Sequence, residues 1–144
     1  MIRIDEAPWE AMLEHASRAY PNECCGAMLG RINGASEKLV TRAVPLENAF
    51  GGPQSARYEI RPEDLLAAEK AARAEGLTLI GIYHSHPDCD AYFSATDLKH
   101  SCPWYLFVVL SIREGRFNHA CCWKPDPDLT RADREPMMSP KGEF

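Results

Sequence analysis

The sequence has no long apolar run and no excess of basic residues. No stretch approaches the roughly 20 consecutive apolar residues that a membrane-spanning helix needs. The first residues, MIRIDEAPWEAML, carry acidic side chains where a signal peptide would have its apolar core. Lysine and arginine number 16 against 21 aspartates and glutamates, so the formal net charge is −5. Nucleic acid and anionic membranes favour basic partners. We therefore expect a soluble, cytoplasmic protein that binds neither.

Six cysteines are present, yet no two have the C-x-x-C spacing of a redox or metal-binding motif. Two of the pairs are adjacent, and the full set is Cys24, Cys25, Cys89, Cys102, Cys121 and Cys122. Because the cytosol keeps thiols reduced, we expect most of them to be buried as small apolar residues. A second metal site built from His100 and Cys102 is an alternative, but ordinary packing explains that pair more simply.

The length of 144 residues, with 45% hydrophobic and 26% charged residues, fits one globular domain. Apolar spacing and the positions of Pro, Gly and Asn predict helices and strands in mixed order. The predicted helices cover residues 8–20, 62–75 and a short segment after Ser94, and the predicted strands cover residues 25–31, 37–44, 77–84, 104–112 and 116–123. This order indicates an α/β fold in which helices pack on one mixed β-sheet, with Trp104 and Phe107 in its core.

The composition changes from Lys124 onward. Prolines recur at positions 125, 127, 136 and 140 within a polar segment. We therefore assign the domain to residues 1–124 and expect residues 125–144 to form a Pro-rich, loosely ordered C-terminal tail.

The segment GIYHSHPDCDAYFSATD contains the residues that indicate chemistry. His84 and His86 follow the strand predicted over residues 77–84, and side chains two apart on a strand face the same way. If the extended geometry continues as far as Pro87, both imidazoles face one spot. Asp97 comes after a loop that is long enough to turn back toward them.

Ser94 to Asp97 have the form of a helix N-terminus, with Ser94 as the cap and Asp97 at the third helical position. Asp97 would then lie at the edge of the cleft that His84 and His86 face. Two histidines and one aspartate make a three-ligand zinc site, which leaves the fourth position for water, as in catalytic sites. A zinc-bound water becomes a nucleophile near neutral pH, but it needs a general base that is not itself a ligand.

These residues resemble the JAMM signature of the MPN-plus, Mov34-like zinc metallopeptidases. The HSHP sequence at residues 84–87 matches the His-Ser/Thr-His-Pro part of the signature, and seven residues separate its second histidine from Ser94. Two more residues separate Ser94 from Asp97, as in the family. The family also has a glutamate upstream, at the start of a strand near the first helix. Glu23, within PNECCG at residues 21–26, fits that position.

The resemblance implies a role for each of these residues. His84, His86 and Asp97 would bind one Zn²⁺ per chain. Glu23 would act as general base on the zinc-bound water and then as general acid to the leaving amine. Ser94 would donate a hydrogen bond to the tetrahedral oxyanion. The implied reaction is hydrolysis of the peptide or isopeptide bond after the C-terminal Gly-Gly of a ubiquitin-like protein.

The resemblance covers roughly residues 2–123 and implies a cytidine-deaminase-like JAMM/MPN fold. Only residues 100–103 stand between the short helix and the next strand, so the chain looks like the compact prokaryotic form of the family. Members of that form are associated with ubiquitin-like sulfur-carrier proteins, from which they remove a cysteine or a C-terminal extension. A cysteine, an extension and an isopeptide-linked protein all stay candidates for the released group, and the oligomeric state stays open.

Two other functions compete with hydrolysis. MPN-type relatives that lack motif residues serve as non-catalytic protein-binding scaffolds, whereas this chain carries every residue of the motif. A base deaminase is suggested by the shared fold, but it would need H-x-E and P-C-x-x-C signatures, and the sequence has neither. The sequence therefore favours a zinc hydrolase.

Overall fold

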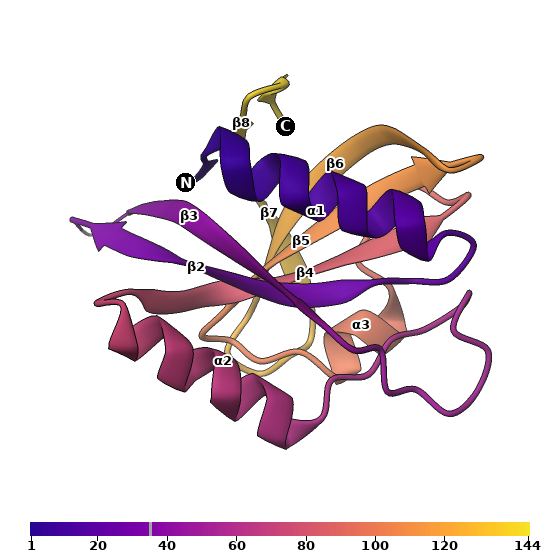
Figure 1. The fold of residues 1–144 in the computed structure, drawn as a ribbon, viewed down its shortest axis with the longest axis horizontal. Helices are drawn as coiled ribbons and strands as arrows, with labels where there is room; N and C mark the ends of the chain where they lie inside the picture. The colour runs from indigo at the N-terminus through magenta and orange to yellow at the C-terminus, as the bar shows by residue number, and fades with distance from the viewer. Residues whose placement is uncertain (35) are drawn as a thin grey trace.

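The computed structural model describes residues 1–34 and 36–144. Over these residues, one mixed sheet of nine strands has the order β7-β6-β5-β4-β2-β3-β1-β8-β9. Helix α1 (Glu6–Ala19) covers one face of the sheet, and helices α2 (Pro62–Ala74) and α3 (Ala95–Lys99) lie on the other (Figure 1). The strands are β1 (Ile2–Ile4), β2 (Cys25–Asn33), β3 (Glu37–Leu46), β4 (Thr78–Pro87), β5 (Leu106–Arg113), β6 (Arg116–Pro125), β7 (Ala132–Glu135), β8 (Met137–Ser139) and β9 (Gly142–Glu143).

The centre of the sheet combines antiparallel and parallel pairs. Strand β4 lies between β2, its antiparallel neighbour, and β5, its parallel neighbour. Strands β2 and β3 pair as an antiparallel hairpin, and Gly34 between them has a φ of 65°, which glycine adopts without strain. All the helices and strands predicted from the sequence are present, so the α/β fold with one mixed sheet is confirmed.

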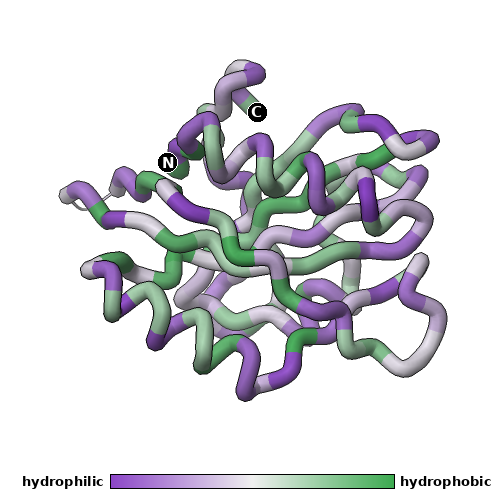
Figure 2. Tube along the Cα trace, in the orientation of Figure 1, coloured by the Kyte–Doolittle hydropathy of each residue, from purple (hydrophilic) through white to green (hydrophobic). Residues whose placement is uncertain are grey.

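Each face of the sheet has its own apolar cluster. Trp9, Met12 and Ala16 of α1 are buried in a cluster with Tyr83 of β4 and Val108 of β5. The opposite cluster joins α2 to β2 and β4, and its buried members are Ala27, Leu29, Ala68, Ala72 and Leu79. Figure 2 shows apolar residues along the central strands and alternating character along the two long helices, as expected for amphipathic helices on a sheet. No helix in the described part of the chain is long and apolar enough to span a membrane.

A bulge in β4 decides which way its last side chains point. Strands β2 and β4 shift register at Ile80, which is an extra residue on β4. Leu79 packs toward α2, whereas Ile80 and Tyr83 both pack toward α1. The extra residue reverses the alternation of the strand, and His84 and His86 therefore turn to the face that α2 and α3 cover.

Strand β4 approaches β5 closely at Gly81. A Cβ atom at this position would lie 1.9 Å from the carbonyl oxygen of Leu106. Any side chain would force the two strands apart, so glycine is needed here for the parallel pairing. That pairing sets His84 beside Val109 on the same face of the sheet.

The C-terminal segment is ordered, so the expectation of a loosely ordered tail over residues 125–144 is wrong. The segment forms β7, β8 and β9, and β8 pairs in parallel with β1. Met137 has only 1% of its surface exposed, and the ring of Phe144 stacks on that of Trp9 with centroids 6.1 Å apart. Strands β1 and β8 have three residues each, which is too short for an alternating pattern to reveal them.

Trp104 lies at the surface rather than in the core. Its exposed fraction is 69%, whereas Phe107 is buried as expected. Strand β5 begins at Leu106, so Trp104 belongs to the loop that precedes the strand. The prediction for Trp104 is wrong because the apolar run is longer than the strand that it contains.

Truncation of Met137 tests whether the C-terminal strand stabilises the domain. We expect Met137→Ala to lower the free energy of unfolding by about 2–4 kcal/mol, because it leaves a cavity in a well-packed cluster. Met138 is only partly buried, so Met138→Ala is the matched control and should cost much less. Urea unfolding followed by circular dichroism measures both losses. Equal, small losses would contradict the placement of β8 in the core.

Candidate metal centre

The structure buries four of the predicted site residues in one place. His84 and His86 lie near the C-terminal end of β4 with 0% and 5% of their surfaces exposed, and Asp97 lies on the first turn of α3. Glu23 is also buried and stands just before β2. Because Cys25 pairs with His84 in the antiparallel register, Glu23 lies beside His86. The extended geometry expected for the two histidines is thus confirmed.

Two ring nitrogens and one carboxylate oxygen form an equal-sided triangle. His84 Nε2 and His86 Nε2 are 3.2 Å apart, and Asp97 Oδ2 lies 3.2 Å from each of them. Ligand atoms about 2.0–2.1 Å from a tetrahedral metal ion are about 3.3–3.4 Å apart, whereas octahedral geometry would bring them to about 2.9 Å. The triangle therefore has the size of one face of a tetrahedral coordination sphere. Hydrogen bonds explain it less well, because each Nε2 can hold at most one proton.

Further hydrogen bonds hold the triangle in place. His86 Nδ1 lies 2.9 Å from the backbone oxygen of Asp90, which assigns the proton to Nδ1 and leaves a lone pair on Nε2. Ser94 caps α3: its Oγ accepts a bond of 2.9 Å from the Asp97 N–H, and its own N–H donates to Asp97 Oδ2 at 3.0 Å. The predicted capping arrangement is confirmed, and it directs the Asp97 carboxylate toward the histidines.

Glu23 is held through its backbone rather than its side chain. Its N–H donates to the Gln54 carbonyl at 2.7 Å, and its carbonyl accepts a bond of 3.1 Å from Asn48 Nδ2. Its Oε1 atom is buried without a hydrogen-bond partner among the described residues. Ligand atoms of Glu23, His84 and His86 all lie within 4.8 Å of one another, so Glu23 is a neighbour of the tighter triangle that includes Asp97.

Sequence reasoning missed the contacts that the loop between β3 and α2 makes with the site. Asn48 and Gln54 in this loop fix the backbone of Glu23, and Asn48 Nδ2 also donates to the Arg57 carbonyl at 3.1 Å. The ring of Tyr58 lies 4.5 Å from that of His84, measured between centroids. An asparagine among glycines and prolines indicates a turn and carries no sign of its long-range contacts.

Burial affects the two carboxyl groups in opposite ways. Burial raises the pKa of Glu23 to about 8, against a smaller lowering by the charge of His86. Burial would also raise the pKa of Asp97, but its contacts with His84 and His86 and the hydrogen bond from the Ser94 N–H outweigh it and hold that pKa well below its usual range. Burial lowers the pKa of His84, which favours the neutral, metal-binding form. Asp97 is therefore suited to act as a metal ligand, and Glu23 is suited to transfer a proton near neutral pH.

A small cleft of about 270 Å³ opens onto this group of residues. We name it the Glu23 cleft, and its lining residues are Glu23, Ser55, Ala56, His86, Pro87, Cys89, Tyr92 and Ser94. A second, more apolar pocket of about 460 Å³ lies beside His84, with Tyr58, Ile82 and Phe107 in its walls. The site is thus bordered by open space in the Glu23 cleft and, beyond Tyr58, in the second pocket.

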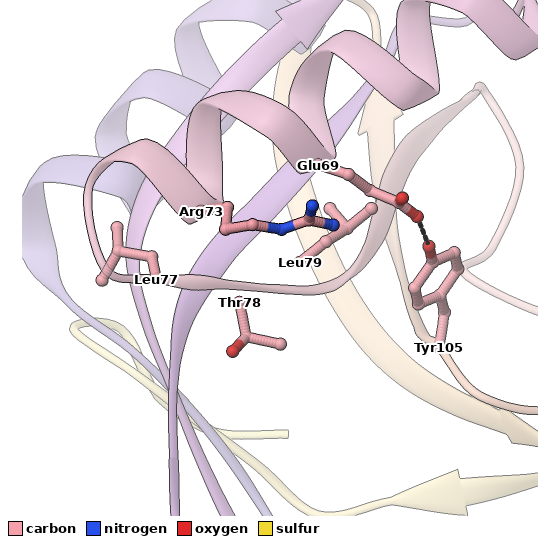
Figure 3. A pocket seen from close by; sticks show the side chains of 6 residues that line it. All are labelled: Glu69, Arg73, Leu77, Thr78, Leu79 and Tyr105. Carbon is pink, nitrogen blue, oxygen red and sulfur yellow. Dashed lines mark hydrogen bonds between the residues drawn. The ribbon is translucent and has the colours of Figure 1, made fainter.

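A third hollow, of about 400 Å³, is separate from the site (Figure 3). It lies where α2 ends and β4 begins, and its lining residues are Glu69, Arg73, Leu77, Thr78, Leu79 and Tyr105. The Tyr105 hydroxyl donates to the Glu69 carboxylate at 2.5 Å across this hollow (Figure 3). None of the buried polar residues of the site borders it, so it is not a candidate for the chemistry.

The structure gives no support to a second metal site. Among residues 1–34 and 36–144, the groups of at least three potential ligand residues in common reach all lie at this one place, around His84 and His86 with Glu23 and Asp97. His100 instead has its Nε2 atom 2.8 Å from Arg57 Nη2. All six cysteines are free thiols, and four are buried as expected, namely Cys24, Cys25, Cys121 and Cys122.

Known proteins share this sequence pattern and fold. A family model described as "Prokaryotic homologs of the JAB domain" matches residues 5–124. The chain is 37% identical over 102 residues to a probable TtuB-protein conjugate cleaving protease of Thermus thermophilus; the match covers 69% of this chain and 64% of that protein, less than two thirds of its length. It is 31% identical over 115 residues to a CysO-cysteine peptidase of Mycobacterium bovis, covering 79% of this chain and 74% of that protein.

A solved structure supports the fold. The solution structure of a protein from Desulfitobacterium hafniense matches with a TM-score of 0.82 at 30% sequence identity. The match covers 96% of this chain and 92% of that one.

The raised pKa of Glu23 predicts a pH-dependent loss of stability in the metal-free protein. The folded state keeps this proton up to about pH 8, whereas an unperturbed glutamate releases it near pH 4.5. Between pH 4.5 and about pH 8, the folded state therefore binds more protons than the unfolded state. The free energy of unfolding falls as the pH rises through this window. Glu23→Gln removes the effect.

Both proteins are treated with chelator. We therefore expect metal-free Glu23→Gln to melt at a higher temperature than the metal-free wild type at pH 8, with little difference near pH 4.5. Differential scanning fluorimetry across the window measures the gap. A gap that stays constant with pH would contradict the raised pKa.

Proposed function

The chain belongs to the family of prokaryotic homologues of the JAB domain, and we propose that it is a zinc-dependent peptidase. Its proposed reaction is hydrolysis of the amide bond after the C-terminal Gly-Gly of a ubiquitin-like or sulfur-carrier protein. The triangle of His84, His86 and Asp97 atoms, with Glu23 beside it, is the observation that carries the proposal. Relatives named for cleaving TtuB conjugates and CysO-cysteine support this substrate class.

We infer that His84, His86 and Asp97 hold one zinc ion per chain. Two neutral imidazoles and a carboxylate are ligands that zinc prefers, and their 3.2 Å spacing suits its tetrahedral geometry. Three protein ligands leave one position open, as in catalytic sites. When bound, zinc would polarise the scissile carbonyl and lower the pKa of water at the open position.

Glu23 is the proposed general base and, later, the general acid. A buried carboxylate oxygen without a partner can accept a proton from the attacking water. Once it has accepted this proton, the carboxyl group can give it to the leaving amine. The backbone contacts with Asn48 and Gln54 keep the carboxyl group in place through both transfers.

Ser94 is proposed to donate a hydrogen bond to the oxyanion while it caps α3. Its Oγ already accepts the Asp97 N–H, so its own hydroxyl proton is free to donate. Ser94 lines the Glu23 cleft together with His86, so this proton can reach a carbonyl oxygen bound there. The capping role and the catalytic role are therefore compatible.

A non-catalytic binding scaffold explains these contacts less well. Burial of Glu23 Oε1, which has no hydrogen-bond partner in the described part of the chain, lowers stability, and a scaffold gains nothing in return. Strongly perturbed ionisable groups beside a cleft are typical of active sites, so hydrolysis is favoured.

Two variants separate the proposed ligands from the proposed base. Asp97→Ala should lose both zinc and turnover, because it removes a ligand. Glu23→Gln should keep about one zinc per chain but lose nearly all turnover, because an amide cannot accept the proton. Mass spectrometry of the metal and release of a Gly-Gly-terminated carrier measure the two effects. Full activity of Glu23→Gln would exclude Glu23 as the base, and wild-type protein that binds no zinc would favour the scaffold.

A second pair of variants tests Ser94. We expect Ser94→Ala to lower kcat by about 10²-fold or more while zinc content is unchanged, because one oxyanion donor is lost. Ser94→Thr keeps the hydroxyl group and should restore much of kcat. Steady-state kinetics on zinc-loaded proteins measures both. Turnover of Ser94→Ala equal to that of the wild type would restrict Ser94 to its capping role.

A further inference from the structure

One row of polar side chains crosses the sheet beside the candidate metal centre. His86 of β4 pairs with Ser111 of β5, and Ser111 pairs with His119 of β6. Register partners on neighbouring strands point to the same face of a sheet, so all three side chains lie on one face. Directly after β4, the loop of residues 88–91 passes over this row and contacts each member of it. A residue of the row that fixes this loop can also fix His86, and its role as such rests on the proposed function.

A single peptide unit of the loop joins His86 to His119. The Asp90 carbonyl accepts from His86 Nδ1 at 2.9 Å, and the Ala91 N–H donates to His119 Nε2 at 3.0 Å. This carbonyl and this N–H belong to the same planar peptide group, which we name the 90–91 peptide unit. A rotation that breaks the bond to His119 therefore turns the carbonyl away from His86 as well. The His119 ring thus holds the acceptor that fixes the tautomer and orientation of His86.

Two further side chains bind the peptide units on either side of this one. Ser111 Oγ donates to the Cys89 carbonyl at 2.5 Å, and Trp123 Nε1 donates to the Ala91 carbonyl at 2.9 Å. These bonds fix the neighbouring units, but the 90–91 peptide unit can still rotate about the two soft dihedral angles that flank it. The bond to His119, on the side away from His86, selects its orientation.

The bond to His119 is shielded from water. Ala91 has 1% of its surface exposed, so its N–H would stay unpaired if the acceptor were lost. Arg113 also reaches this part of the loop, 2.6 Å from the Asp90 carboxylate, but both side chains are exposed and such ion pairs contribute little. We propose that His119 is a positioning residue: through the 90–91 peptide unit it orients His86 and so raises the affinity of the site for zinc.

This role requires an acceptor at the Nε2 position of the His119 ring. A backbone N–H only donates, so Nε2 carries the lone pair and the neutral ring has its proton on Nδ1. The Asn118 side-chain amide lies 2.8 Å from Nδ1 and can turn its oxygen toward that proton. At position 119, glutamine would place its amide oxygen about where Nε2 lies, whereas the shorter asparagine would reach only to the place of Nδ1. The two amides therefore differ in reach but not in chemistry.

The two amide variants test the role of His119. We expect His119→Asn to bind zinc about tenfold more weakly than the wild type, because the 90–91 peptide unit loses its acceptor. We expect His119→Gln to stay within about threefold of the wild type, because its oxygen replaces Nε2. His119 is only half-buried, so the position accepts either polar side chain. Competition with a chromophoric zinc chelator measures the dissociation constants of the full chains.

The hydrogen bond between His86 and the loop gives a second readout on the zinc-loaded proteins. While the Asp90 carbonyl binds the Nδ1 proton of His86, that proton exchanges slowly with water. We expect its resonance in proton NMR spectra of the wild type and of His119→Gln. In His119→Asn the proton should exchange faster, so that its resonance broadens or is lost. A general loss of stability would not single out this one proton.

His15→Phe is the control for stability alone. It removes a contact of 2.8 Å between His15 Nδ1 and the Tyr83 hydroxyl on the face that α1 covers, and it should leave zinc affinity unchanged. Zinc affinity of His119→Asn equal to that of the wild type, or an equal loss in His119→Gln or His15→Phe, would overturn the role of His119 and leave the peptidase proposal standing. A wild type that binds no zinc would overturn the proposed function, and the role of His119 with it.

Discussion

The extra residue at Ile80 in β4 is the constraint on which the site depends. Successive side chains of a strand point to opposite faces of the sheet. One added residue therefore turns every later side chain to the opposite face. Without the bulge, His84 and His86 would point into the cluster beneath α1. With it, they point to the face where α3 presents Asp97. The geometry of the candidate metal centre thus depends on the strand register as well as on the residue types.

Burial then gives the two carboxyl groups different chemistry. Asp97 has two imidazoles and the Ser94 N–H to stabilise its charge, so it stays ionised. Glu23 has a buried oxygen with no such partner among the described residues, so it holds its proton more tightly. The two carboxyl groups of the site are therefore suited to different chemical roles because their surroundings differ. The loop that carries Asn48 matters because it holds Glu23 in this unfavourable position.

The triangle of His84, His86 and Asp97 could be predicted because its members are close in the sequence, where strand period and helix capping apply directly. The bulge could not, because LTLIGIYH is apolar on both faces and an extra residue leaves no trace in its pattern. The pairing of β1 with β8 joins the two ends of the chain, and neither strand is long enough to show a period. The predicted roles of Glu23 and Ser94 come from a resemblance, and they stay predictions.

A single oxygen atom, Asp97 Oδ2, contacts both histidines and also accepts the Ser94 N–H at the start of α3. An ion in the triangle and the first turn of this helix therefore depend on the same atom, so metal binding and the local order of the chain are thermodynamically linked. Ser94 also borders the Glu23 cleft, which extends the linkage to the substrate side. Under the proposed function, a shortage of zinc would therefore weaken substrate binding as well as hydrolysis.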